Sequence, residues 1–219
     1  MSLIPARIGK IETSSLLLIL TNCIPLAGVL FFGWSVFETL FLYWVESGII
    51  ALATIALLAL MPISAADRAG VPVNQKLIAI PFFMLHFGGF MAAHLFLIIF
   101  FLGDPDQGNI LWQALETVRK NHSLGWALLS MLVSHGYSFV VNYIRTNKYL
   151  QPLSKENFWP IMVRPYKRIV MMQLTILIGA FGVLILRLPQ PMMAAMVVVK
   201  TLFDLRAHKK EHEQIGPVI

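Results

Sequence analysis

The chain has 219 residues, of which 58% are hydrophobic and 13% charged, and its formal net charge is +6. Soluble domains contain about 25% charged residues, so this chain is too apolar to cover itself with a water-compatible surface. The composition excludes an ordinary soluble protein, and we read the basic excess as membrane topology rather than nucleic-acid binding. We therefore expect an all-α bundle in the lipid bilayer, built as one integral membrane domain over residues 1–219.

Six apolar segments approach the length of about 20 residues that a helix needs to cross the hydrocarbon. The first ends in large aromatic residues without a small-residue cleavage site, so we expect it to be retained rather than removed as a signal peptide. Most prolines fall at or between the segment ends, where helices tolerate them. The predicted transmembrane helices cover residues 15–33, 36–61, 77–102, 123–144, 169–188 and 191–205.

Two connecting segments have the composition of membrane-surface structure. Residues 110–118, between the third and fourth predicted helices, form an amphipathic stretch that we expect on the outer surface. Residues 158–160, Phe-Trp-Pro, are typical of an interfacial segment, which we expect at the cytoplasmic face.

Basic residues determine the predicted orientation. They gather in the N-terminal segment, the second-to-third loop, the fourth-to-fifth loop and the tail, which share one side of a six-helix bundle. The positive-inside rule therefore predicts a bacterial inner-membrane protein with both termini in the cytoplasm. The fourth-to-fifth loop holds the largest group, made of Arg145, Lys148, Lys155, Arg164, Lys167 and Arg168.

Several ionisable side chains fall inside the predicted helices, where each costs about 2.5–3.5 kcal/mol on insertion scales. At about 1.5 Å per residue, Glu46, His86 and His135 reach similar depth from three consecutive helices. Two imidazoles and a carboxylate are the ligands of catalytic zinc and of non-haem iron, so these three are the predicted metal ligands. The residues expected to line the same polar cavity or its access path are His94, Ser138, Asn142, Lys200 and Asp204.

Other functions fit the same residues. Haem held by His86 and His135 is one, since two histidines are chemically suitable axial ligands. A small proton- or ion-coupled transporter is another, in which the buried ionisable groups form a relay and a homodimer supplies two halves. A third possible function is that of a structural membrane subunit, whose helices are held together by polar contacts between them. We prefer a metal-dependent membrane enzyme, although the sequence names neither its catalytic residues nor its substrate.

Four motifs resemble an uncharacterised bacterial family of multi-pass membrane proteins, a domain of unknown function. The resemblance spans nearly the whole chain and implies no established activity. The matching motifs include the polar residues that we proposed as site residues because of the free-energy cost of placing such side chains in the membrane. The motifs are Trp34-Ser35 with Tyr43-Trp44-Val45-Glu46; His86-Phe87-Gly88 with His94; Ser134-His135 with Ser138-Phe139-Val140-Val141-Asn142-Tyr143; and Lys200 with Asp204.

Overall fold

In the part of the chain that it describes, the computed structural model consists of helices joined by short connections. The only β-type pairing among those residues is an isolated bridge between Ile63 and Leu153. The predicted all-α class is therefore confirmed for this part of the chain. The structure describes residues 24–63, 73–103, 110–181 and 198.

Three helices are long and apolar enough to cross a membrane. They agree with the second, third and fourth predicted segments. They are α2 (Val36–Leu60), α3 (Val73–Leu102) from Lys76 onward, and α5 (His122–Phe139) with its π-helical continuation η2 (Val140–Ile144).

The remaining predicted spans lie partly or wholly outside the described residues. The first, 15–33, is described from residue 24, and residues 24–31 are helical. The last, 191–205, is described only at residue 198. The number of membrane crossings therefore stays a prediction.

As far as it is described, the fifth predicted span is part of a longer helix. Helix α6 (Lys155–Phe181) begins well before residue 169 and includes residues 158–160, expected as an interfacial segment. Its start is explained by a reciprocal cap, in which the Ser154 N–H donates to Asn157 Oδ1 at 2.9 Å and the Asn157 N–H donates to Ser154 Oγ at 3.4 Å. Several basic residues assigned to the fourth-to-fifth loop are therefore helical: Lys155, Arg164, Lys167 and Arg168.

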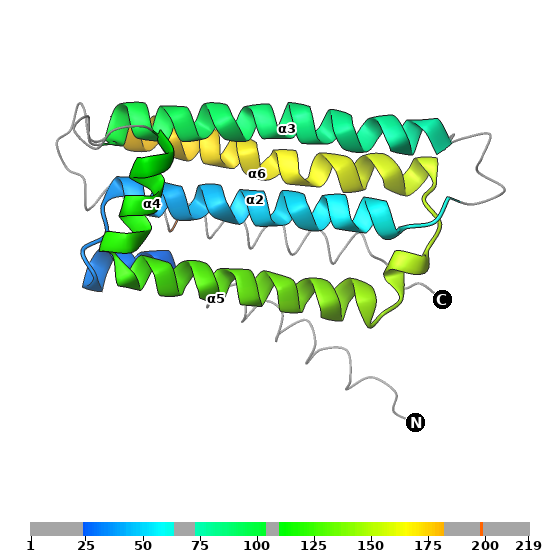
Figure 1. Cartoon of the computed structure of the whole chain (residues 1–219), viewed down its shortest axis with the longest axis horizontal. Coiled ribbons are helices and arrows are strands. Elements are labelled where there is room, and N and C mark those ends of the chain that lie inside the picture. The colour runs from blue at the N-terminus through cyan, green and yellow to red at the C-terminus, as the bar shows by residue number, and fades with distance from the viewer. Residues whose placement is uncertain (1–23, 64–72, 104–109, 182–197, 199–219) are drawn as a thin grey trace, which may run out of the picture. The chain divides into compact units, whose positions relative to one another are not determined.

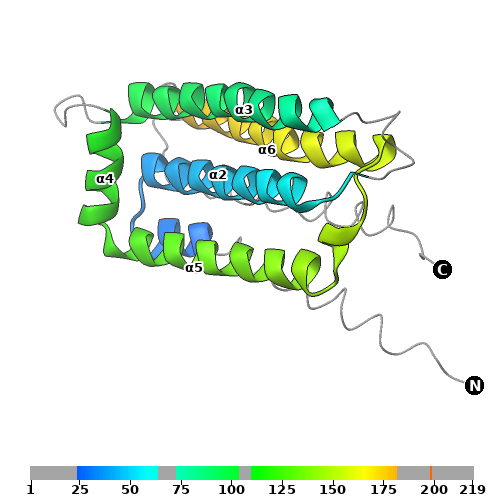
Figure 2. The same cartoon turned by 45° about the vertical axis from the view of Figure 1, so that its right-hand side comes forward.

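The described chain separates into two compact units, residues 24–39 with 177–181 and residues 40–176. Within residues 40–176, α2, α3, α5 and α6 run side by side, and α4 (Ile110–Lys120) crosses one end between α3 and α5 (Figures 1 and 2). The indole N–H of Trp44 on α2 donates to the Met91 carbonyl on α3 at 2.7 Å, which fixes these helices against each other.

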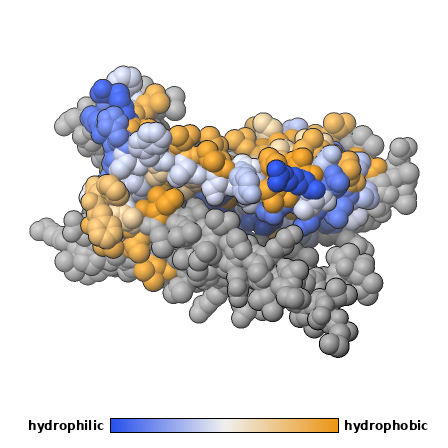
Figure 3. Space-filling model, turned by 90° about the horizontal axis from the view of Figure 1, so that it is seen from below, coloured by the Kyte–Doolittle hydropathy of each residue, from blue (hydrophilic) through white to orange (hydrophobic). Residues whose placement is uncertain are grey.

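The outer surface of residues 40–176 is strongly apolar. Phe83, Ile98 and Met131 are buried, but Leu85 is 80% and Phe100 68% exposed. Figure 3 shows hydrophobic residues over much of the visible surface of the described helices. Apolar residues on both the inner and the outer faces of helices are expected for a bundle surrounded by lipid.

In the unit that holds residues 24–39, the chain turns tightly ahead of α2. Gly33 has φ of +65°, and the Trp34 N–H donates to the Gly28 carbonyl at 3.0 Å. The Trp34 side chain is buried against Gly28, where an added Cβ would overlap its ring. Helix α2 is then capped reciprocally by Ser35 and Glu38, since the Ser35 N–H donates to Glu38 Oε2 at 2.7 Å and the Glu38 N–H donates to Ser35 Oγ at 3.2 Å.

Replacing Gly28 by Ala is expected to lower the free energy of unfolding by about 1–3 kcal/mol, because the new methyl group must displace the Trp34 ring. Gly88→Ala on α3 is the matched control, since no atom lies within 4 Å of its ideal Cβ. That control should be neutral or stabilising by up to about 1 kcal/mol through helix propensity. Thermal unfolding in detergent compares the two variants, and equal effects would contradict the Gly28–Trp34 contact.

Candidate functional site

A buried carboxylate on α2 forms the centre of the candidate site. Glu46 is 5% exposed, and its Oε1 lies 2.8 Å from Nη1 of Arg168 on α6 and 3.6 Å from Nε2 of His135 on α5. We call these three residues the Glu46 cluster. The Arg168 contact is an ion pair, and the His135 contact becomes one when the imidazole is protonated.

Glu46 and Arg168 lie near the middle of α2 and α6, and His135 lies just past the middle of the span formed by α5 and η2. The Glu46 side chain is 7% exposed, whereas those of Arg168 and His135 are 29% and 20% exposed. Glu46 is therefore the deepest of the three, and the two basic groups lie closer to the surface. Charges this far along apolar helices are expensive unless they are paired, and the pairing explains how Glu46 is accommodated.

The structure brings two of the three predicted metal ligands together and leaves the third with another partner. Glu46 and His135 are in contact, but His86 Nδ1 lies 2.8 Å from the Tyr166 hydroxyl. The His86 ring stacks on Phe82 and meets Phe90 edge-on, with centroid distances of 5.2 and 5.1 Å.

The positions of His86 and His135 can be compared with the predicted metal and haem sites. Within the described residues, no group of three or more His, Cys, Asp or Glu side chains is placed to hold a metal ion. His86 and His135 also contact different helices, α6 and α2, rather than forming a recognisable axial pair. Zinc, iron and haem therefore stay predictions from the sequence.

His94 is buried at 4% exposure and makes a local contact. Its Nδ1 lies 2.6 Å from the Phe90 carbonyl one turn earlier on α3, so Nδ1 donates and Nε2 is left as an acceptor. Nε2 has no hydrogen-bond partner among the described residues. His94 makes no described contact with the Glu46 cluster, and its role as a cavity residue stays a prediction.

Polar groups continue from the cluster towards the ends of α5 and α6. Asn142 Nδ2 donates to Ser138 Oγ at 2.9 Å, and Arg164 Nη1 donates to the Tyr143 hydroxyl at 2.9 Å. We call Ser138, Asn142, Tyr143 and Arg164 the polar stripe. Its α5 side lies at the transition into π-helix η2, a geometry that is frequent at functional sites.

Two residues of the candidate site were not identified from the sequence, and two residues that were predicted for it lie outside the described part of the chain. Arg168 and Arg164 were read as loop charges because they stand in a basic run beside two prolines. The reciprocal cap at Ser154 was the signal that would have placed them on a helix. The residues that lie outside the described part of the chain are Lys200 and Asp204.

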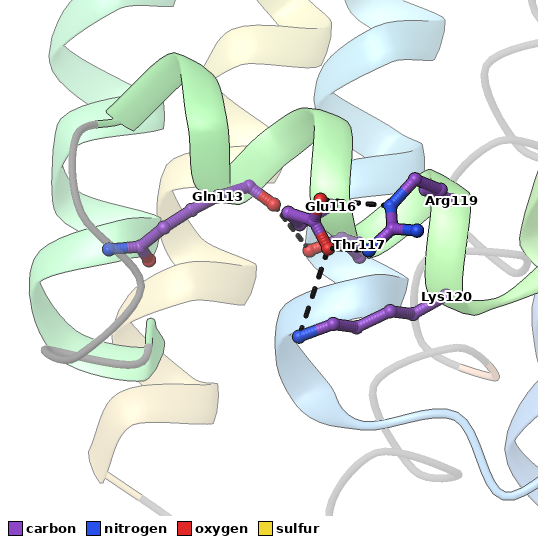
Figure 4. Close-up of polar contacts among 5 residues, drawn as sticks. All are labelled: Gln113, Glu116, Thr117, Arg119 and Lys120. Carbon is purple, nitrogen blue, oxygen red and sulfur yellow. Dashed lines mark hydrogen bonds and ion pairs between the residues drawn. The ribbon is translucent and has the colours of Figure 1, made fainter.

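A separate charged group lies on α4, outside the candidate spans (Figure 4). Arg119 donates to Glu116 through Nε at 2.9 Å and Nη2 at 2.8 Å, and Lys120 Nζ lies 3.9 Å from Glu116 Oε2. The hydrogen bonds from Arg119 lower the pKa of Glu116, with its positive charge and that of Lys120 acting in the same direction. This carboxylate stabilises one helix and has no described contact with the Glu46 cluster.

Comparison with curated proteins gave no match. Comparison with solved structures gave none either. Residues 5–218 match a family of unknown function, DUF6498, which confirms the predicted resemblance to such a family. Because the match covers almost the whole sequence, the chain belongs to the family of unknown function DUF6498.

Proposed function

We propose that this chain is a multi-pass protein of the bacterial inner membrane that couples proton movement to the transport of a small solute. Glu46 is the group that gains and loses the proton, and His135 exchanges it with water. The observation that carries the proposal is the 2.8 Å contact between buried Glu46 and Arg168, with His135 beside them, midway along helices of which two are candidate spans. Ionisable groups in such positions mark proton and ion pathways.

The cluster suits this function because its charge depends on one proton. With Glu46 ionised, Arg168 has its counter-ion close by. When Glu46 is protonated, Arg168 loses this counter-ion, and the electrostatic attraction between α2 and α6 at this point is weakened. A change in one protonation state therefore favours a different arrangement of α2 and α6, which is the two-state behaviour that transport requires.

The geometry favours this function over a metal-dependent membrane enzyme. A divalent cation at Glu46 would meet the Arg168 guanidinium at the same oxygen atom, and like charges repel. Among the residues that the structure describes, Glu46 and His135 are the two potential ligands in contact, whereas catalytic zinc sites use three protein ligands. The order of preference reached from the sequence is therefore reversed.

The proposed topology keeps six crossings with both termini in the cytoplasm. Although α6 removes several basic residues from the fourth-to-fifth loop, Arg145 and Lys148 remain in the connection before it, with Lys155 at the start of the helix. Their charge still favours the cytoplasmic side. A homodimer would supply the two halves found in larger transporters.

The test uses vesicles that contain purified protein and a pH-sensitive dye, exposed to an external proton gradient. A pool of amino acids and small organic acids is added outside. We expect the wild type to acidify the lumen faster than protein-free vesicles, and Glu46→Gln to fall to the protein-free rate. Glu38→Gln is the matched control on α2 and should retain flux, because Gln preserves the cap with Ser35. Wild-type flux equal to that of protein-free vesicles, or full flux in Glu46→Gln, would overturn the proposal.

A further inference from the structure

Helix α4 buries polar side chains and exposes apolar ones, which is the reverse of a helix on the surface of a soluble protein. Its polar residues Gln113 and Glu116 are only 6% and 7% exposed, whereas its apolar residues Trp112 and Leu115 are 55% and 65% exposed. A helix in contact with water alone would present the opposite faces. The outward face of α4 is therefore suited to a partner that is apolar at least in part.

The buried polar face of α4 is stabilised by contacts within the helix itself. Glu116 accepts hydrogen bonds from Arg119, and Thr117 Oγ1 donates to the Gln113 carbonyl at 2.8 Å (Figure 4). These bonds run along the helix and do not determine which face of α4 is turned outward. The outward position of Trp112 and Leu115 is therefore considered together with what surrounds α4 in the fold.

The place of α4 in the fold is consistent with this outward position. It joins the end of α3 at Leu102 to the start of α5 at His122, and both of those helices are candidate membrane spans. A connection between two successive spans lies where hydrocarbon gives way to water. Trp126, in the second turn of α5, is 72% exposed at the same end, and tryptophan is enriched at this boundary.

Positive charge accompanies the apolar face. The side chains of Arg119 and Lys120 are 73% and 57% exposed while both contact Glu116. One carboxylate balances one of the two cations, so the C-terminal turn of α4 keeps a net positive charge. Amphipathic helices with basic residues bind the interface of bilayers that contain anionic lipids.

We infer that α4 is an interfacial helix that docks on anionic phospholipid. Trp112 and Leu115 enter the boundary between headgroups and acyl chains, and Arg119 and Lys120 contact lipid phosphate groups. This inference is independent of the Glu46 cluster and of the proposed transport.

The single native cysteine allows a direct test. In full-length Cys23→Ser protein, Leu115→Cys is labelled with an environment-sensitive fluorophore and reconstituted into phosphatidylcholine vesicles. Brominated phosphatidylglycerol or brominated phosphatidylcholine is included at equal mole fraction. The inference predicts quenching by both lipids, stronger by at least about twofold for phosphatidylglycerol. A label at Gln151→Cys, an exposed position in the turn before α6, should be quenched mainly by aqueous iodide.

Charge variants test the lipid preference. Arg119→Gln with Lys120→Gln should make quenching by the two lipids equal, whereas Arg119→Lys with Lys120→Arg should keep the preference. A label at residue 115 that iodide quenches and brominated lipids do not would overturn the inference. So would a blue-shifted label that neither agent quenches, because a second copy of the chain would then cover α4.

Discussion

Replacing Glu46 by Gln is expected to lower the free energy of unfolding by about 2–5 kcal/mol. The substitution keeps the shape of the side chain but leaves the Arg168 guanidinium without the carboxylate that lies 2.8 Å from it. Breaking a buried ion pair from one side is costly because the remaining charge stays in a poorly solvated site. Chemical unfolding in mixed detergent micelles measures the change, and Glu38→Gln at the capped end of α2 is the control.

A double-mutant cycle with Arg168→Met shows whether the effect belongs to the pair. Removing both charges is expected to restore part of the stability lost in either single variant, with a coupling energy of about 1–3 kcal/mol. Strictly additive losses would mean that Glu46 and Arg168 do not interact as described.

Phe83→Ala is expected to lower the free energy of unfolding by about 3–5 kcal/mol, because it leaves a cavity between α3 and α6. The Phe83 side chain is fully buried, stacks on Phe87 at 5.0 Å and meets the Tyr166 ring edge-on at 5.8 Å. Its neighbour Phe82 is the matched control, since it is 54% exposed.

Phe82→Ala should change stability by less than about 1 kcal/mol in the same unfolding assay. Losses of the same size for the two phenylalanines would contradict the packing of α3 against α6. A larger loss for Phe82 would mean that the opposite face of α3 is the buried one.

The helical class followed from composition, and three span positions followed from the lengths of apolar runs. Those runs are long, and a membrane leaves the backbone few alternatives to a helix. The start of α6 was missed because Pro160 and Pro165 and a basic run suggested a loop. The hydrogen bonds between Ser154 and Asn157 cap the helix at its N-terminus, so that it begins before both prolines.

Depth along a helix predicted the contact between Glu46 and His135 but not the direction of His86. Helical spacing gives the height of a side chain in the bundle, whereas its azimuth depends on which neighbour the helix packs against. His86 contacts Tyr166 on α6, a helix whose start was predicted beyond that residue. The same error concealed Arg168, whose partner Glu46 was already the central candidate.

The most direct test of the account is infrared difference spectroscopy on the reconstituted protein during a pH titration, with Glu46→Gln as reference. The account predicts a carboxylic-acid C=O band that appears on acidification while the protein remains folded. The band should be absent in Glu46→Gln and should titrate at a different pH in Arg168→Gln. A spectrum with no band assignable to Glu46 at any pH at which the protein is folded would contradict the proton-binding role of the Glu46 cluster.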